Sequence, residues 1–337
     1  MLVFTLRRLL LTIPLLLVAS FIVFTIVTAF PGDPCREKLG PRPNPEALET
    51  CRTSLNLDGS FGERYGNFMS GLVQGDLGRD IHTDEPVARE IWIRFPATVE
   101  LSLAALVLAF VLGSWIGTKS ALRPGSWIDA LGQLVSLGGV SIPVFWLGML
   151  LIAIFGVKLG WLPFSGWSAE EIGPGIEYAT GFYMLESLVR LEFGAFWNAV
   201  KHLILPAIAL CTIPLATITR MTRSAVLEEV GKDYVTTARA KGVSQRVIMR
   251  KHVRRNALIP VITITGLQLG TLLSGAVLTE TVFSWQGMGT YMMASVKARS
   301  YPAIMGCMLL FVLIFVLVNL LVDLLYHWID PRLREAG

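Results

Sequence analysis

Six long apolar stretches constrain the fold of this chain more than any other feature of its sequence. Each meets or approaches the length of about 20 residues that a helix needs to cross roughly 30 Å of hydrocarbon. Of the 337 residues, 53% are hydrophobic and only 16% are charged, which also departs from the composition of a soluble domain. We therefore expect an all-α integral membrane protein with six transmembrane helices, which begin near Leu9, Ala97, Ala130, His202, Ala257 and Ala303.

The first apolar stretch, residues 9–30, is interpreted as a retained membrane span and not as a secretory signal. It follows Arg7 and Arg8, but it is longer than the apolar region of a signal peptide. It also runs into Pro31-Gly32-Asp33-Pro34, where a signal peptide would carry a cleavage site of small residues. Residues 1–30 are then an N-terminal transmembrane helix.

The distribution of charge predicts the orientation, because Lys and Arg accumulate on the cytoplasmic side of a membrane. Residues 220–255 hold ten Lys or Arg and three acidic residues, whereas residues 33–94 hold eight basic and eleven acidic residues. The first segment is therefore expected in the cytoplasm and the second outside. If six spans alternate, both termini are cytoplasmic, and basic loops account for the net charge of +4 without nucleic-acid binding.

Residues 31–96 are expected to form a small external cap segment. Pro41, Pro43 and Pro45 predict an extended entry, and residues 46–55 predict a short helix.

The four cysteines divide by location. Cys35 and Cys51 lie in the external segment, where a bridge would close a short loop worth roughly 3 kcal/mol, and the sequence leaves the bridged and the free state equally open. Cys211 and Cys307 fall within predicted spans and are expected to be inert packing residues.

Residues 97–337 are expected to form the transmembrane core, with a basic cytoplasmic loop at residues 220–256. In the third apolar stretch, Gly138, Gly139 and Pro143 predict a kink. Outside the spans, residues 168–195 predict a surface-lying helix, and residues 282–301 predict a segment that lies at, or dips into, the membrane surface.

The basic loop contains the sequence D-Y-V-T-T-A-R-A-K-G at residues 233–242. On a helix, Tyr234, Ala238 and Gly242 lie at i, i+4 and i+8, so one stripe carries an aromatic residue and two residues small enough for close backbone approach. We interpret the stripe as a docking surface for a partner protein. The alternative is an amphipathic helix that lies on anionic lipid through Lys232, Arg239 and Lys241.

Motifs for catalysis and for metal binding are not found in the sequence. It has no G-x-x-x-x-G-K-[ST], H-E-x-x-H or G-x-S-x-G, and the pair Asp76 and Asp80 is expected in an external turn. The four histidines lack metal-ligand spacing: His82, His202, His252 and His327. We expect no enzyme activity, no metal and no cofactor bound by this chain.

Polar residues within the spans are candidates for a solute pathway. Gln268, Thr271 and Ser274 are spaced three apart and are expected to line a polar passage or to make hydrogen bonds between helices. Glu100 and Glu280 fall near external span ends, where reaching the interface and lining the pathway are both open, and Asp323 falls near the cytoplasmic end of the last span.

Blocks along nearly the whole chain resemble the permease subunits of bacterial and archaeal ABC importers of the peptide and nickel branch. The blocks are Pro31-Gly32-Asp33-Pro34, G-D-L-G from Gly75, R-F-P-A-T from Arg94, W-L-P from Trp161, residues 233–242, T-E-T-V-F-S-W from Thr279, and D-P-R from Asp330. Residues 233–242 resemble the family's E-A-A-x-x-x-G loop, with Thr236 and Thr237 in place of its first two letters. The following H-V-R-R-N-A resembles H-x-L-R-N-A, with Arg254 in place of Leu.

The resemblance implies a type I ABC importer permease fold in the inner membrane of a bacterium or archaeon. It implies a homologous second permease subunit, two ATPase subunits that bind ATP and Mg²⁺, an extracytoplasmic binding protein and a solute. Residues 180–197 resemble an insertion of dipeptide-type members, which indicates short peptides. The residues expected to couple to the ATPase are Asp233, Tyr234, Ala238, Lys241 and Gly242.

Two other classes of function were weighed against the importer. An autonomous secondary transporter or channel also uses six spans and intramembrane polar groups, but it leaves the basic docking loop unexplained. A membrane receptor needs a cytoplasmic signalling domain, and we identify none in this sequence.

Overall fold

The computed structural model describes residues 2–29, 33–40, 42–54 and 57–329, without the side chains of residues 2–7, 9, 54 and 325–329. Within these residues the chain forms helices and no strand, so the expected all-α fold is confirmed. In chain order the elements are α1 (Leu2–Ala29), α2 (Pro34–Leu39), α3 (Pro45–Ser54), α4 (Phe61–Val73), α5 (Val87–Leu122), α6 (Trp127–Ser141), α7 (Val144–Leu151), the π-helix η1 (Ile152–Lys158), α8 (Ala169–Ile172), α9 (Tyr183–Val189), α10 (Phe193–Val230), α11 (Asp233–Ala240), α12 (Gln245–Val247), the π-helix η2 (Ile248–Val253), α13 (Arg254–Gly275), α14 (Val277–Val282), α15 (Met288–Lys297) and α16 (Tyr301–Ile329).

Five helical segments of the described chain are long and apolar enough to span a membrane, and a bent pair supplies a sixth. The five are Leu10–Ala29, Val87–Leu122, Phe193–Val230, Gln245–Gly275 and Tyr301–Leu324. The bent pair is α6 with α7 and η1, between which the helix direction bends by 105°. Counted as one broken span, the pair gives the six spans that the sequence predicts.

The bend lies where the sequence predicts a kink, but it is a complete break. Ile142, which precedes Pro143, is extended at φ −88° and ψ 122°. The ring of a proline disfavours helical geometry in the preceding residue, so α6 ends here and α7 starts in a new direction.

The two longest helices, α5 and α10, pack together along the centre of the molecule. α5 has 36 residues and α10 has 38. A Cβ atom on Gly117 of α5 would lie 2.6 Å from the carbonyl oxygen of Thr219. Only glycine permits so close an approach, so these two helices pack with backbone near backbone.

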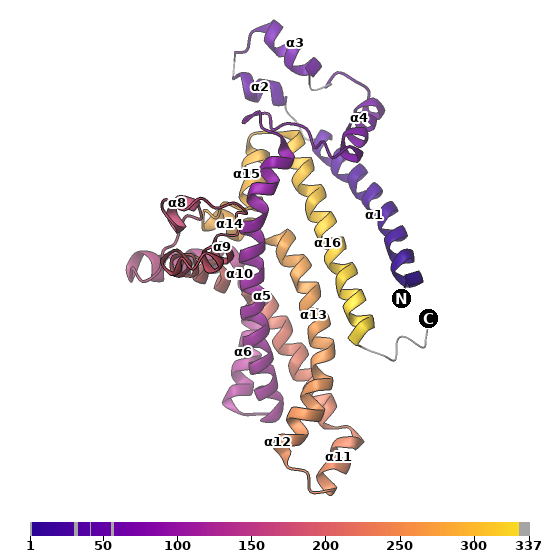
Figure 1. Cartoon of the computed structure of the whole chain (residues 1–337), viewed down its shortest axis with the longest axis vertical. Helices are drawn as coiled ribbons and strands as arrows, with labels where there is room; N and C mark the ends of the chain where they lie inside the picture. Colours follow the sequence, from indigo (N-terminus) through magenta and orange to yellow (C-terminus); the bar gives the residue numbers. More distant parts are fainter. Residues whose placement is uncertain (1, 30–32, 41, 55–56, 330–337) are drawn as a thin grey trace.

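Figure 1 shows the short helices α2, α3 and α4 at one end of the molecule and α11 with α12 at the other. We call these the cap end and the basic end. α1 and α16 lie side by side, and Arg8 of α1 forms an ion pair with Asp323 of α16. That pair places Asp323 on the same end of α16 as the start of α1, as the alternating spans predict.

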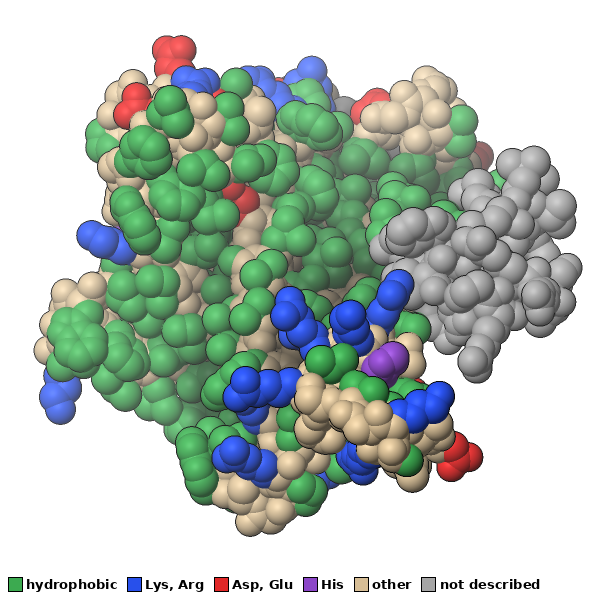
Figure 2. Space-filling view, turned by 60° about the horizontal axis from the view of Figure 1, so that its bottom comes forward, with side chains coloured by type: hydrophobic (Ala, Val, Ile, Leu, Met, Phe, Trp, Pro, Cys, Tyr) green, Lys and Arg blue, Asp and Glu red, His purple; other side chains and the backbone are tan. Residues whose placement is uncertain are grey.

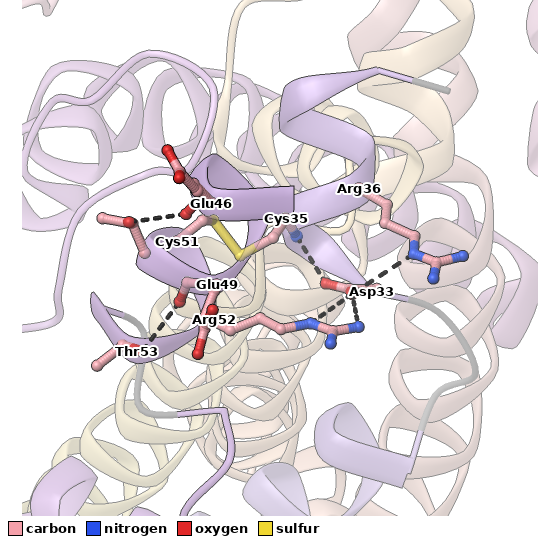
Figure 3. Close-up of a disulfide and its surroundings, with 9 residues drawn as sticks. Asp33, Cys35, Arg36, Glu46, Glu49, Cys51, Arg52 and Thr53 are labelled. Carbon is pink, nitrogen blue, oxygen red and sulfur yellow. Dashed lines mark hydrogen bonds and ion pairs between the residues drawn. A yellow bond between two sulfur atoms is a disulfide. The ribbon is translucent and has the colours of Figure 1, made fainter. Parts of the chain in front are cut away.

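A disulfide joins Cys35 of α2 to Cys51 of α3, with their Cα atoms 5.8 Å apart (Figure 3). Asp33 caps α2 by accepting a hydrogen bond from the backbone N–H of Cys35 and also accepts from the guanidinium of Arg52 at 2.9 Å. Burial opposes ionisation of Asp33, but the bonds from Arg52 and Cys35 prevail and lower its pKa. The short helix expected at residues 46–55 is α3, and Leu55 lies outside the described residues.

The single surface-lying helix predicted for residues 168–195 is wrong. The segment forms the short helices α8 and α9, because glycines and a proline interrupt it between them. The carboxylate of Glu186 in α9 accepts hydrogen bonds from the backbone N–H groups of Ala179 and Thr180, which hold the loop between α8 and α9 in place.

The first part of the segment predicted to lie at or dip into the membrane surface, residues 282–301, packs inside the described chain, whereas Val296, Lys297 and Arg299 near its end are exposed. Trp285 is 1% exposed, stacks on Trp167 with ring centroids 3.9 Å apart, and donates its Nε1–H to the carbonyl oxygen of Ala97. The segment therefore closes the cap-side end of the core.

Candidate functional site

The basic loop between α10 and α13 projects from the basic end of the molecule (Figure 1). Seen from that end in Figure 2, Lys and Arg side chains gather around the loop. The exposed basic residues of this patch are Arg220, Lys232, Arg239, Lys241, Arg246, Arg250, Lys251, Arg254 and Arg255. The loop thus presents a short helix at the centre of a positively charged surface.

The helix α11 is held against the body of the chain by its apolar side. Val235 is fully buried, and Tyr234 and Ala238 are partly buried beside it. They pack on a cluster formed by the ends of α5 and α10, η2 and the start of α13, made of Ala121, Ala225, Val226, Ile248, Val253 and Ala257.

This packing qualifies the expected docking stripe. Tyr234 and Ala238 do lie on one side of the helix, and that side packs on the chain's own core and leaves both side chains partly exposed. The face of α11 that is free to meet a partner carries Asp233, Thr236, Thr237, Arg239 and Ala240, all of them exposed. Of the predicted coupling residues, Asp233, Lys241 and Gly242 remain accessible.

Polar contacts fix α11 to both of its neighbouring spans. Glu229, near the end of α10, accepts a hydrogen bond from the Tyr234 hydroxyl at 2.5 Å and pairs with the Lys232 ammonium. Asn256 of α13 donates to the Tyr234 hydroxyl oxygen at 3.5 Å. Burial and the bond to Glu229 raise the pKa of Tyr234, so the hydroxyl stays a donor. α11 is therefore bonded to the end of α10 and to the start of α13.

Gly242 ends α11 through a backbone motif that needs a left-handed residue. Its φ is +76°, its N–H donates to the carbonyl of Arg239 at 3.0 Å, and the N–H of Val243 donates to the carbonyl of Ala238 at 3.1 Å. These two bonds define a Schellman motif, in which glycine is favoured at this position. A Cβ atom there would meet nothing within 4 Å, so the glycine serves the turn and not close packing within the chain.

A buried ion pair that the sequence analysis missed lies among the spans at the basic end. Asp129 of α6 is 2% exposed and accepts bonds from Arg223 of α10 at 2.8 Å and from the backbone N–H of Gly125 at 3.0 Å. The Ser120 hydroxyl of α5 bonds the same carboxylate. Asp129 directly precedes the third apolar stretch and Arg223 follows the fourth, and opposite charges at two span ends were the available signal, because charges inside a bundle are paired.

The three polar candidates of α13 share one accessible strip of the helix. Thr271 is exposed, while Gln268 and Ser274 are partly buried. The hydroxyls of Thr271 and Ser274 donate to carbonyls of α13 itself, those of Gln268 and Gly270. The contacts within the described chain therefore give these residues no bond to another helix and leave them free to face a partner or a solute.

Glu280 is separate from that strip. It is fully buried in α14, where its carboxylate accepts bonds from the Thr98 hydroxyl at 2.6 Å and from the backbone N–H groups of Gly289 and Thr290 at 2.7 and 3.2 Å. Burial raises the pKa of Glu280 to about 7. Enclosed in this way, Glu280 joins α5, α14 and α15.

The interpretation that Glu100 and Glu280 reach the membrane interface is wrong. Glu100 is 5% exposed, and its Oε1 accepts the backbone N–H groups of Met184 and Leu185 in the first turn of α9. Both carboxylates bond backbone groups inside the cap side of the core, because the segments after η1 and α13 fold over them.

No group of acidic, histidine and cysteine side chains in the described part of the chain could hold a metal ion. The C-terminal block of the resemblance, from Asp330 to Arg332, lies outside the described residues, as do Pro31, Gly32 and Arg334.

Comparison with known proteins agrees with this geometry. The family described as "Binding-protein-dependent transport system inner membrane component" matches residues 90–335, and the N-terminal family of such membrane components matches residues 1–102. A dipeptide transport system permease protein of Alkalihalophilus pseudofirmus is 44% identical over 334 residues, 99% of this chain and 100% of the relative. A di/tripeptide transport system permease protein of Pseudomonas aeruginosa is 46% identical over 335 residues, 99% of each chain.

A third relative carries a different substrate in its name. A glutathione transport system permease protein of Escherichia coli is 39% identical over 334 residues, 99% of each chain. The motif resemblance to ABC importer permeases is thereby confirmed, and the chain belongs to the family of binding-protein-dependent transport system inner membrane components.

Proposed function

We propose that this chain is one half of a transmembrane heterodimer that imports di- or oligopeptides, driven by ATP hydrolysis on two partner subunits. A homologous second permease completes the pathway, and an extracytoplasmic binding protein delivers the peptide. The observation that carries the proposal is identity above 40% over almost the full chain to relatives named for dipeptide and di/tripeptide transport. ATP and Mg²⁺ belong to the partner subunits, since this sequence has no phosphate-binding loop.

The basic end faces the cytoplasm in this proposal. Its exposed Lys and Arg side chains satisfy the positive-inside rule, and Arg8 at the start of α1 lies at the same end through its pair with Asp323. Both termini are then cytoplasmic, and the disulfide-bonded cap lies outside, in a compartment that can be oxidising.

The ATPase meets the outward face of α11, and its motion is passed to the spans. Because Val235 is buried and Glu229 bonds both Lys232 and Tyr234, α11 moves as one body with the ends of α10 and α13. Closure of the ATPase pair would then rock the spans between inward-open and outward-open states. The strip of Gln268, Thr271 and Ser274 on α13 is the candidate lining of the pathway between the two permeases.

The first test is to isolate the tagged chain from native membranes in mild detergent, identify the proteins that co-purify with it, and assay ATP hydrolysis with and without peptide-loaded binding protein. A second permease and ATPases with peptide-stimulated hydrolysis support the proposal. A chain that purifies alone and drives solute flux from an ion gradient is the autonomous transporter and contradicts it.

The docking face is tested by adding bulk where α11 is exposed. Thr237→Trp should abolish co-purification of the ATPase while leaving membrane insertion intact, because Thr237 lies on the free face. Thr50→Trp, on exposed α3 at the cap end, is the matched control and should leave co-purification unchanged. Equal ATPase recovery with both variants would place the contact elsewhere.

A further inference from the structure

The turn after α15 has the same backbone motif as the turn after α11, but with an arginine where glycine is favoured. The N–H of Ser300 donates to the carbonyl of Ser295 at 2.9 Å, and the N–H of Arg299 donates to the carbonyl of Val296 at 3.2 Å. Arg299 has a φ of +53°, in the left-handed region that a side-chain-bearing residue rarely adopts. Gly242 occupies the equivalent position after α11, so the chain accepts strain at Arg299 that it avoids at Gly242.

An apolar groove of about 530 Å³ lies directly below this turn, between α1, α15 and α16. Its walls combine the last turns of α1 with the first turns of α16, two helices long and apolar enough to span the membrane. Ile26 and Val27 come from α1, Met292 and Val296 from α15, and Ile304 and Met308 from α16. The groove therefore lies near the cap-side ends of two candidate spans, where lipid headgroups would lie if both helices cross a membrane.

Two cations complete the groove. Lys297, the last residue of α15, and Arg299 both belong to its lining and are both exposed. Neither side chain has an ion pair or hydrogen bond with another described residue. The Asp80 carboxylate, which contacts the adjacent Ser300, is itself buried and bonded by Tyr291 and Ser300.

We propose that this groove binds an anionic phospholipid of the leaflet at the cap end. Lys297 and the Arg299 guanidinium take the phosphate, and an acyl chain lies along Ile26, Ile304 and Met308. Arginine suits this position because its planar guanidinium donates two parallel hydrogen bonds to phosphate oxygens. The strained backbone at Arg299 is retained because the left-handed turn places the side chain beside the groove.

The test compares lipid retention by the full chain in its isolated complex, using native mass spectrometry after addition of phosphatidylglycerol or phosphatidylcholine. Phosphatidylglycerol should be retained in preference. Arg299→Gly should reduce its retention by about fivefold while leaving the melting temperature unchanged or higher, since glycine relieves the turn. Arg299→Lys should restore part of the retention, and Arg42→Gly, an exposed cap arginine, is the control that should have no effect.

A second variant tests the apolar wall with both charges in place. Met308→Trp fills the groove and should also reduce retention of phosphatidylglycerol. Unchanged retention in Arg299→Gly, or equal retention of the two lipids, would overturn the proposal. A third outcome would also overturn the proposal. If Arg299→Gly left lipid retention unchanged but altered the ATPase activity stimulated by the binding protein, equally with and without phosphatidylglycerol, Lys297 and Arg299 would contact a protein and not a lipid.

Discussion

At the scale of single residues, Gly242 in the basic loop has a conformational role that the sequence alone does not reveal. Gly242 was expected to give space for a partner, but its left-handed φ and the two bonds of the turn explain it without one. A residue at position 242 must adopt a left-handed backbone, and it must also be small if a partner packs against it. A short series of variants can separate these two requirements.

We expect Gly242→Ala to destabilise the loop by about 1 kcal/mol, because Cβ disfavours the left-handed conformation. Gly242→Asn should cost less and keep ATPase stimulation, since Asn tolerates this region. Gly242→Glu should abolish stimulated hydrolysis but leave membrane insertion intact. Hydrolysis assays and thermal unfolding of the complexes measure both effects, and loss of stimulation in the Asn variant would show that the partner needs the space.

Glu280 gives the protein a predicted dependence on pH. Its pKa in the folded chain is about 7, raised from an ordinary 4.5 by burial, which outweighs the three hydrogen bonds to its carboxylate. Folding then favours the protonated form, so this contribution to stability is complete below about pH 4.5 and is lost as the pH rises through 7. Glu280→Gln should flatten the fall in melting temperature between pH 5 and about pH 8, whereas parallel profiles for the two proteins would contradict the assignment.

At the scale of helices, the hydropathy pattern located the spans but not their full extent. α5 begins at Val87, while the predicted span began near Ala97, because a helix can continue through charged residues such as Arg89 and Glu90 that no hydropathy window includes. A kink near Pro143 followed from the sequence, but the complete break and its angle did not. The sequence correctly predicted that Tyr234 and Ala238 lie on one side of a helix. The same spacing is compatible with packing on the chain's own core and with docking to a partner, so the position of the neighbouring helices was needed to show the packing.

The helices α5, α6 and α10 are joined by Asp129, and removing its charge should loosen all three. Asp129→Asn leaves Arg223 without its anion and should lower the free energy of unfolding by about 1 to 3 kcal/mol. Combination with Arg223→Gln in a double-mutant cycle gives the pairwise energy. Glu85→Gln, which breaks the exposed pair with Arg89, is the control and should change stability by less than about 0.5 kcal/mol.

At the scale of the whole molecule, the two ends have different means of holding their shape. The basic end relies on packing of α11 and on buried polar contacts, whereas the cap end relies on the disulfide between α2 and α3 and on the ion pair of Asp33 with Arg52. The sequence predicted both segments, but it left the disulfide undecided because two cysteines 16 residues apart do not reveal their distance in space.

The disulfide should stabilise the cap alone. Cys35→Ser with Cys51→Ser removes a cross-link worth about 3 kcal/mol and should speed proteolysis within the cap while leaving the spans protected. Limited proteolysis in lipid nanodiscs, followed by mass analysis of the fragments, measures this difference. Cys211→Ala, at a buried free thiol, is the control and should not expose the cap; a cap equally resistant in the double variant would argue that the cross-link is dispensable.

The length of α10 has a mechanical consequence. At about 1.5 Å per residue, its 38 residues extend about 57 Å, close to twice the hydrocarbon thickness of roughly 30 Å. The helix is therefore a lever arm, supported in the bilayer and carrying α11 at its far tip. A tilt of only about 10° about the opposite end of the helix would move that tip by about 10 Å, so a small rotation of the span produces a large displacement at the basic end.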